Sequence, residues 1–293
     1  MRLFQLSICS ALLMGSLESC TQSIDPSSTY YDQNDADIQA YVSQNNLQGT
    51  LRSTGLYYVV TTPNPTGKQA TTGEEIEFTY KSYNLKTGQV VDSSAANRPV
   101  YYPLGIGSIL PGLEEGLSLM REGERSTLLI PSYLAYSDKS KTNLPAYSVI
   151  RFDVRFNRSR SEEQQIEEYI AVQKFTNVEK TASGLRFIKT KDNPTGATPT
   201  TSQTLTIKYA GKQLRSVTPF DSTGSGTFDA VLGQSKYVKG FEEGLAKLKV
   251  GEKATIIFPS SLGYGATGVV QNNTYVITPY APLRFDLEVI SAK

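Results

Sequence analysis

Apolar residues recur with two different periods along this chain. Residues 150–156 alternate strictly between apolar and charged side chains, and residues 283–289 repeat the same alternation. Period-2 alternation indicates strands with one face on a core and one face in water, as in antiparallel sheets. Shorter apolar runs predict further strands at residues 56–60, 76–83, 185–188 and 205–209.

Two short amphipathic helices are predicted by apolar residues spaced at i, i+3 and i+4. They fall within residues 38–42 and 166–170. Ser161 and Gln164 stand at capping-box spacing before the second of them, which we expect to link two domains. The polar residues 21–35 are typical of a flexible tether.

The chain carries a long internal repeat. Residues 112–117 read Gly-Leu-Glu-Glu-Gly-Leu and residues 240–245 read Gly-Phe-Glu-Glu-Gly-Leu, with other landmarks also 128 or 129 positions apart. Such a period is far longer than that of solenoid repeats, so each copy should own a core. A short helix at each Gly-Glu-Glu-Gly segment among several strands predicts an α+β fold class. Gly116 and Gly244 weaken their helices by ~1 kcal/mol, which indicates close approach of helix to sheet.

These patterns divide the 293 residues into five parts. We expect a signal peptide, a tether with a short helix, a first copy, a linker helix and a second copy. The predicted ranges are 1–19, 20–50, 51–160, 161–180 and 181–293, respectively.

The N-terminus predicts export. Arg2 precedes a mostly apolar stretch at residues 3–17 that is too short to span a bilayer permanently. The following Leu17-Glu18-Ser19-Cys20 resembles a bacterial lipoprotein signal, although Glu18 departs from the small residue usual there. The resemblance implies that Cys20 is the lipidated first residue of a protein anchored to the cell envelope, at the outer membrane on its periplasmic or surface face. The alternative is an ordinary secretory signal with an incidental cysteine.

Composition excludes several function classes. Lys+Arg number 29 and Asp+Glu 28, without a basic stripe, so we expect no nucleic-acid partner. Histidine is absent and only 2 cysteines occur, which argues against a His-based nucleophile pair and a thiolate zinc site. We therefore expect no cofactor or metal.

Linked motifs in the second copy resemble those of FKBP-type peptidyl-prolyl cis-trans isomerases. The match covers about residues 200–293, and in the first copy about residues 73–156. The motifs include Tyr209-Ala210-Gly211, Pro219-Phe220-Asp221-Ser222, Val238 to Leu245, Gly251-Glu252-Lys253, Leu262 to Gly265 and Leu283-Arg284-Phe285-Asp286. The resemblance implies a bent antiparallel sheet wrapped over one short helix, with a ligand pocket between them.

The resemblance also assigns roles in that pocket. It implies walls and floor from Tyr209, Phe220, Phe228, Tyr237, Val238, Phe241, Ile277 and Phe285. Asp221 would be a polar pocket residue, and Tyr264 would donate its hydroxyl proton to a ligand carbonyl. Taken singly, each aromatic residue also fits core packing, Asp221 fits a turn and Tyr264 fits loop anchoring.

The first copy departs from this pattern. Val91, Val100 and Leu113 stand where the second copy has Phe220, Phe228 and Phe241. It keeps four matching residues, Tyr80, Asp92, Tyr136 and Phe152. Its wall residue is Leu144, and the segment from Tyr136 to Leu144 is shorter than the one from Tyr264 to Ile277. We therefore predict a degenerate first pocket that is weakly active or only binds.

The family resemblance implies isomerisation of Xaa-Pro bonds in exported, proline-containing polypeptides. Amide rotation makes and cuts no bond, so a desolvating aromatic pocket without a nucleophile suits it. The main alternative is a non-catalytic chaperone or peptide-binding assembly module, and a third is a surface adhesin. The pairs Glu114/Glu115 and Glu242/Glu243 could suggest a two-carboxylate hydrolase, but adjacent helical residues point different ways. We expect them to face solvent near a helix N-terminus.

Overall fold

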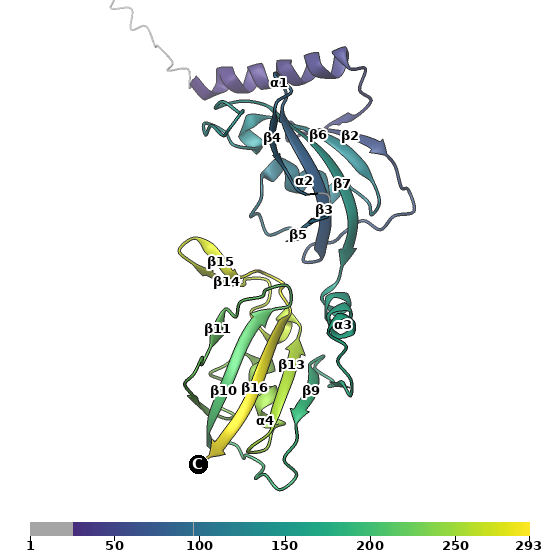
Figure 1. Ribbon diagram of the computed structural model, residues 1–293. Helices are drawn as coiled ribbons and strands as arrows, with labels where there is room; N and C mark the ends of the chain where they lie inside the picture. Colours follow the sequence, from purple (N-terminus) through teal and green to yellow (C-terminus); the bar gives the residue numbers. More distant parts are fainter. Residues whose placement is uncertain (1–25, 96) are drawn as a thin grey trace, which may run out of the picture.

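The computed structural model describes residues 26–95 and 97–293, and it contains one seven-stranded antiparallel sheet in each copy (Figure 1). The predicted signal peptide and Cys20 lie outside the described residues. Within the described part of the chain, no helix is both long and apolar enough to cross a membrane.

Each copy is built from the same elements in the same order. The first unit consists of α1 (Pro26–Gln44), β1 (Thr50–Leu51), β2 (Tyr57–Thr62), β3 (Glu75–Asn84), β4 (Val90–Ser93), β5 (Val100–Pro103), α2 (Pro111–Leu119), β6 (Arg125–Ile130), the 3-10 turn Ser132–Leu134 and β7 (Ile150–Arg160). The second consists of α3 (Glu162–Gln173), β8 (Glu179–Lys180), β9 (Arg186–Lys191), β10 (Thr204–Gln213), β11 (Asp221–Ser222), β12 (Phe228–Val231), α4 (Lys239–Ala246), β13 (Lys253–Phe258), the 3-10 turn Ser260–Leu262, the extra hairpin β14 (Val269–Gln271) and β15 (Thr274–Ile277), and β16 (Leu283–Ala292).

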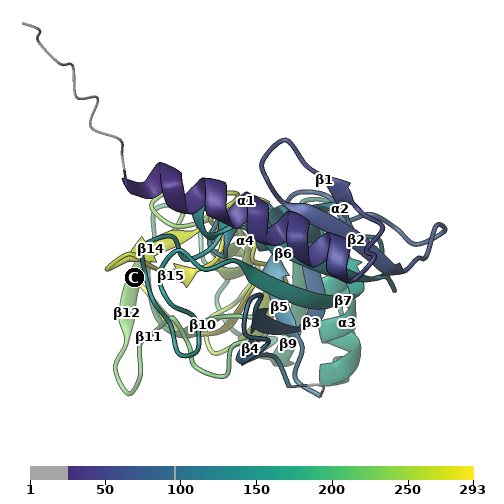
Figure 2. The same ribbon diagram turned by 90° about the horizontal axis from the view of Figure 1, so that it is seen from above.

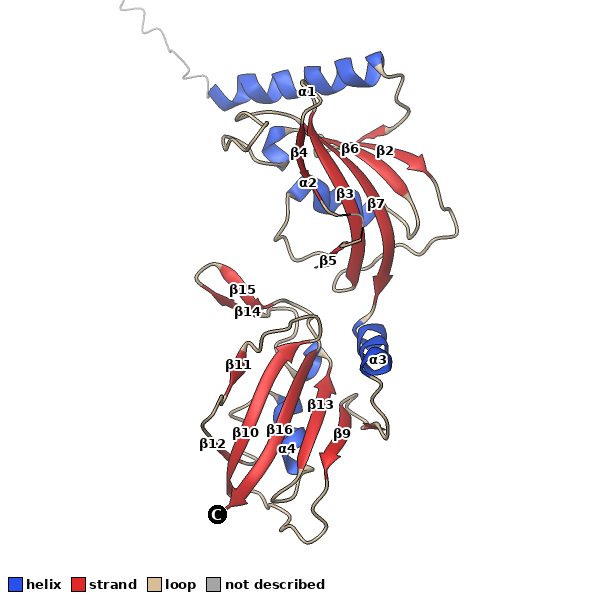
Figure 3. Ribbon diagram, viewed as in Figure 1, coloured by secondary structure: helices blue, strands red, loops and turns tan. Residues whose placement is uncertain are grey.

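Sheet topology is identical in the two copies. The first sheet has the order β1-β2-β6-β7-β3-β4 with β5 also paired to β3, and the second has β8-β9-β13-β16-β10-β11 with β12 paired to β10. The alternating segments form the long strands β7 and β16, which lie beside β3 and β10 (Figure 3). The predicted α+β fold class is confirmed.

The short helices α2 and α4 pack closely against their sheets. A Cβ atom on Gly116 would lie 2.4 Å from Leu128 on β6, and one on Gly244 would lie 2.5 Å from Ile256 on β13. Both contacts are shorter than carbon atoms tolerate. The close approach predicted from the two mid-helix glycines is therefore present, and it offsets their low helix propensity.

Gly244→Ala is expected to lower the free energy of unfolding of the second copy by about 1 kcal/mol, because overpacking outweighs the better helix propensity. Ile256→Val removes the nearest atom, so the double variant should be more stable than the two single effects predict. Chemical denaturation measures both effects. Gly226→Ala, in an exposed turn with only ordinary contacts, is the control. Strict additivity of Gly244→Ala and Ile256→Val would contradict the clash.

A second helix in each unit, α1 or α3, packs on a separate apolar cluster of its sheet. Ile38 of α1 is buried against Leu129 and Val149, and Ile166 of α3 is buried against Ile188 and Ile257. Figure 2 shows α1 lying across the first sheet. The capping box predicted from Ser161 and Gln164 is present at the start of α3. Thus α3 connects the two sheets and is also a packed part of the second unit.

The predicted tether is wrong from Pro26 onward, because α1 begins there. Tertiary contacts hold this polar segment in a helix. The Asn34 amide donates to the Tyr147 carbonyl at 2.8 Å and its oxygen accepts from the Ser132 N–H at 2.6 Å. The Tyr30 ring stacks on Tyr147 with centroids 4.2 Å apart. The spacing of apolar residues within a segment does not reveal such distant partners, so it could not predict this part of the helix.

The expectation that the acidic pairs simply face solvent is also wrong for Glu114. Its Oε1 accepts hydrogen bonds from the N–H groups of Gly105 and Gly107 and from the Tyr102 hydroxyl, at 2.8, 3.2 and 3.0 Å. The neighbouring Glu115 points elsewhere and accepts from Thr54 at 2.7 Å. These carboxylates anchor loops to α2, and they do not form a catalytic pair.

An arginine of the second unit forms an ion pair with the first unit. Arg215, in the loop after β10, donates to both carboxylate oxygens of Glu75 on β3 at 2.8 and 3.1 Å. Its guanidinium lies 3.5 Å from the centroid of the Tyr101 ring. Glu75 also pairs with the buried Arg160 of its own unit at 2.5 Å. Glu75 is therefore shared between an intradomain and an interdomain ion pair.

Candidate functional site

Six aromatic rings of the second copy meet between the sheet and α4, and we call them the aromatic cluster. Its members are Tyr209, Phe220, Phe228, Tyr237, Phe241 and Phe285. Neighbouring ring centroids are 5.2 to 6.3 Å apart, mostly edge to face. This is the separation at which aromatic pairs attract. The structure thus brings together all six aromatic residues that the sequence analysis assigned to the pocket walls and floor.

Strands β10 and β16 position one side of the cluster. Gly211 on β10 pairs in register with Phe285 on β16, and its carbonyl accepts from the Phe220 N–H at 2.9 Å. A Cβ on Gly211 would lie 2.4 Å from the Phe285 ring and 2.9 Å from the Phe220 ring. Glycine at this position leaves the space that both rings occupy.

Helix α4 supplies the other side. Val238 is its N-cap residue, and Phe241 in the first turn is only 5% exposed. Glu242 accepts from the Tyr237 N–H at 3.4 Å and so ties the incoming chain to the helix. The helix start therefore fixes Tyr237, Val238 and Phe241 as one unit against the sheet.

The cluster reaches the surface at one edge. Phe228 is 37% exposed and Tyr264 is 36% exposed, whereas Ile277 at the end of β15 is buried in the core. Tyr237 and Val238 pack half-buried against that core. An exposed aromatic edge over a buried aromatic base can desolvate an apolar group of a ligand.

A fixed polar pair borders the aromatic cluster. The Tyr209 hydroxyl donates to Asp221 Oδ2 at 2.7 Å. Burial, followed by this hydrogen bond and the charge of Asp221, raises the pKa of Tyr209 to about 12. Burial and the charge of Asp221 also raise the pKa of Tyr264. Both phenols are therefore protonated well into the alkaline range, and the Tyr209 proton is donated to Asp221.

Tyr209→Phe is expected to change the alkaline stability profile. Because the phenol has a pKa of 10.0 ordinarily and about 12 when folded, its stabilisation is complete below pH 10 and is lost as pH rises through about 12. The free energy of unfolding should therefore fall more steeply between pH 10 and 12 in the parent than in the variant. Denaturation series at pH 8, 10, 11 and 12 measure this. Parallel curves would show that Tyr209 titrates normally.

One ring was missed by the sequence analysis. Phe258, at the end of β13, stacks almost parallel on Phe285 with centroids 5.8 Å apart. A Cβ on Gly240 would lie 2.5 Å from its ring, so the helix start rests on Phe258. The only signal in the sequence was a fully apolar strand end, which does not distinguish a supporting ring from any other core residue.

The first copy keeps the polar pair and loses most of the rings. Tyr80 donates to Asp92 at 2.6 Å, and its ring contacts Phe152 at 5.4 Å. Burial and Asp92 raise the pKa values of both Tyr80 and Tyr136. The remaining positions are aliphatic, with Val91, Val100, Leu113 and Leu144 packed in the core cluster.

The described residues, 26–95 and 97–293, contain no group of three or more His, Cys, Asp or Glu side chains placed to hold a metal ion. What the site offers is an apolar aromatic surface with fixed hydroxyl and carboxylate groups beside it.

Comparison with known proteins identifies the family. The family model for the FKBP-type peptidyl-prolyl cis-trans isomerase matches residues 66–157 and again residues 196–290. The chain therefore belongs to the FKBP-type peptidyl-prolyl cis-trans isomerase family and carries its domain in tandem.

Similar proteins include several isomerases. The chain is 29% identical over 222 residues to the human peptidyl-prolyl cis-trans isomerase FKBP9, which covers 74% of this chain and 35% of that protein. Over 108 residues it is 32% identical to the bovine FKBP11, covering 36% of this chain and 53% of that protein. The chain thus spans about a third of the length of FKBP9.

Similar solved structures include the three FKBP domains of wheat FKBP73 and FkpA from Escherichia coli. The first is 16% identical, with 82% of this chain and 96% of that chain covered and a TM-score of 0.38. The second is 24% identical, with 46% and 62% covered and a TM-score of 0.39.

Proposed function

We propose that this protein is a peptidyl-prolyl cis-trans isomerase that acts on exported polypeptides, mainly through its second copy. The observation that carries the proposal is the aromatic cluster beside the Tyr209–Asp221 pair, with Phe228 and Tyr264 exposed at its edge. Membership in the isomerase family supports the same reaction class.

The cluster suits amide rotation. Rotation about an Xaa-Pro bond faces a barrier of ~18–20 kcal/mol because amide resonance must be broken. Aromatic walls that remove water from the prolyl ring and the amide oxygen favour the less dipolar, twisted state. Tyr264, whose phenol is protonated at neutral pH and 36% exposed, would donate to a carbonyl oxygen of the bound chain. Asp221, held by Tyr209, would orient the peptide.

The activity is tested by exchange spectroscopy on a proline-containing peptide with the full chain. Cis-trans exchange should become much faster in the presence of catalytic amounts of protein. Peptide binding without any acceleration would instead favour a non-catalytic chaperone. The aliphatic residues Val91, Val100 and Leu113 favour that binding role for the first copy alone.

We also propose that Cys20 carries the lipid that anchors the protein to the envelope membrane. The motive is its place at the end of a signal-like segment. Intact-mass analysis of the membrane fraction should find a diacyl or triacyl cysteine, because two or three chains anchor firmly where one does not. Cys20→Ala should release the protein from the membrane. An unmodified N-terminus elsewhere in the chain would refute the anchor.

A further inference from the structure

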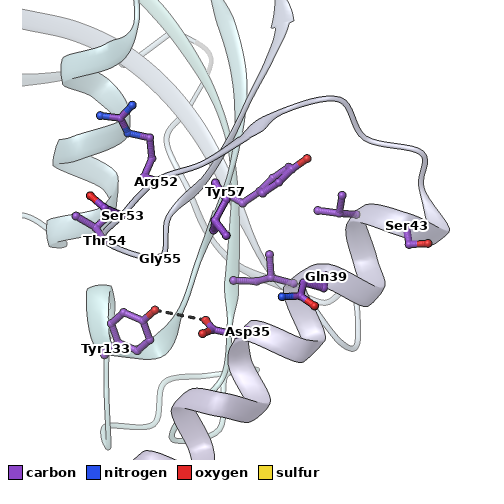
Figure 4. Close-up of a pocket in the computed structure, with 12 residues that line it drawn as sticks. Asp35, Gln39, Ser43, Arg52, Ser53, Thr54, Gly55, Tyr57 and Tyr133 are labelled. Atoms are coloured by element: carbon purple, nitrogen blue, oxygen red, sulfur yellow. Dashed lines mark hydrogen bonds between the residues drawn. The ribbon is translucent and has the colours of Figure 1, made fainter.

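A cavity of about 410 Å³ lies between α1 and the loop that joins β1 to β2. Its lining includes Asp35 and Gln39 from the helix, Gly55 from the loop, Tyr57 from β2, and Tyr133 from the 3-10 turn after β6 (Figure 4). It belongs to the first copy and is separate from the Tyr80–Asp92 pair, which does not line it.

The second copy shows what fills the same place there. Equivalent hydrogen bonds fix the correspondence of the two loops. Thr54 donates to Glu115 as Ser183 donates to Glu243, each at 2.7 Å. The helices correspond likewise, because Asn34 accepts from the Ser132 N–H as Glu162 accepts from the Ser260 N–H. Asp35, Gln39, Gly55 and Tyr57 therefore correspond to Glu163, Glu167, Gly184 and Arg186.

Arg186 occupies that place with its guanidinium group. Its side chain is 1% exposed and donates to the carboxylates of Glu163 and Glu167 and to the carbonyl of Gly184. Acceptors from the helix and the loop thus surround one planar cation, which is the geometry that guanidinium satisfies and ammonium does not.

In the first copy Asp35 and the Gly55 carbonyl remain, the neutral Gln39 replaces Glu167, and the arginine between them is missing. Tyr57 stands in place of Arg186, and its ring extends away from Asp35 toward the Leu47 carbonyl (Figure 4). Within the described residues Asp35 has no ion pair, and it accepts only a long bond of 3.4 Å from the Tyr133 hydroxyl. The nearby Arg52 is paired with Glu115.

We propose that this cavity binds an arginine side chain presented by a partner polypeptide. The guanidinium would take the place that Arg186 fills in the second copy, between Asp35, the Gln39 amide oxygen and the Gly55 carbonyl. Val42 and the 58% exposed Leu51 offer apolar surface for the aliphatic stem of the side chain. This site extends beyond the proposed prolyl site and does not depend on catalysis.

The test uses the full chain and a short capped probe, acetyl-Gly-Arg-Gly amide. NMR titration should shift the amide signals of α1 and residues 51–55. The matching citrulline peptide, which is neutral and nearly the same shape, should bind at least fivefold more weakly. Equal binding of both peptides would overturn the proposal, as would free arginine binding as tightly as the capped peptide.

Variants taken from the second copy sharpen the test. Asp35→Asn should weaken binding at least fivefold, whereas Asp32→Asn, exposed on the same helix outside the cavity, should leave it unchanged. Gln39→Glu restores the second carboxylate and should tighten binding severalfold. Tyr57→Arg should abolish binding, because an internal guanidinium then occupies the site. Unchanged binding in Asp35→Asn would overturn the assignment. Self-association of the chain that the arginine peptide reverses would also overturn it, since the occupant of the cavity would then be a second copy of this chain.

Discussion

Replacing Phe220 and Phe228 by Val and Phe241 by Leu in the full chain is expected to slow catalysed prolyl exchange at least about tenfold. These are the residues that the first copy has at the corresponding positions. Tenfold corresponds to ~1.4 kcal/mol of transition-state binding, which the loss of three ring contacts readily accounts for. Exchange spectroscopy on a Xaa-Pro peptide measures the rate, after circular dichroism has shown that the variant is folded.

Phe258→Leu provides the matched control for this variant. Phe258 is a fully buried ring of the same core that contacts Phe285 and does not reach the exposed edge. Its loss should lower the free energy of unfolding by about 1 kcal/mol and slow exchange much less than the triple variant. If both variants lost the same activity, the aromatic cluster would act through core stability. If the triple variant kept the parent rate, these three rings would not carry the activity.

The sequence predicted the paired architecture because its signals are local and repeated. The alternation at residues 150–156 and 283–289 depends only on neighbouring positions, and each segment became the centre of a sheet. Because each motif occurs twice, comparing the two copies also showed which features they share and which positions differ. The six rings of the aromatic cluster could be named for the same reason, as family motifs linked in a fixed order.

What the sequence did not predict depends on contacts between distant residues. The first half of α1 is helical because Asn34 bonds to Ser132 and Tyr147, about a hundred positions away. The cavity beside it lies where the second copy has Arg186, and the first copy has Tyr57 there and Gln39 in place of Glu167. The hairpin β14–β15 lies in the segment from Tyr264 to Ile277, which is longer than its counterpart in the first copy. The sequence showed this difference in length and did not show that the extra residues form a hairpin.

The contact between the two units offers the last test. Glu75 is nearly buried and bonds both to Arg160 of its own unit and to Arg215 of the other. Glu75→Ala should remove the bridge and leave Arg160 buried with only the exposed Glu168 as partner. Loss of a partner from a buried pair costs about 3 kcal/mol, so the first copy should unfold at lower denaturant concentration. The radius of gyration from small-angle scattering should also rise, since the ion pairs from Arg158 and Arg160 to Glu168 join β7 only to the helix that directly follows it.

Arg215→Ala separates these two effects, because Arg215 is half-exposed and bonds only across the contact. It should raise the radius of gyration as Glu75→Ala does and leave the stability of the first copy within about 0.5 kcal/mol of the parent. Glu77→Ala is the matched control on the same strand, because Glu77 pairs with Arg158 inside its own unit. Its expected radius of gyration is that of the parent. An unchanged radius in both Arg215→Ala and Glu75→Ala would mean that α3, with the ion pairs from Glu168 to Arg158 and Arg160, and the remaining packing fix the arrangement of the two units.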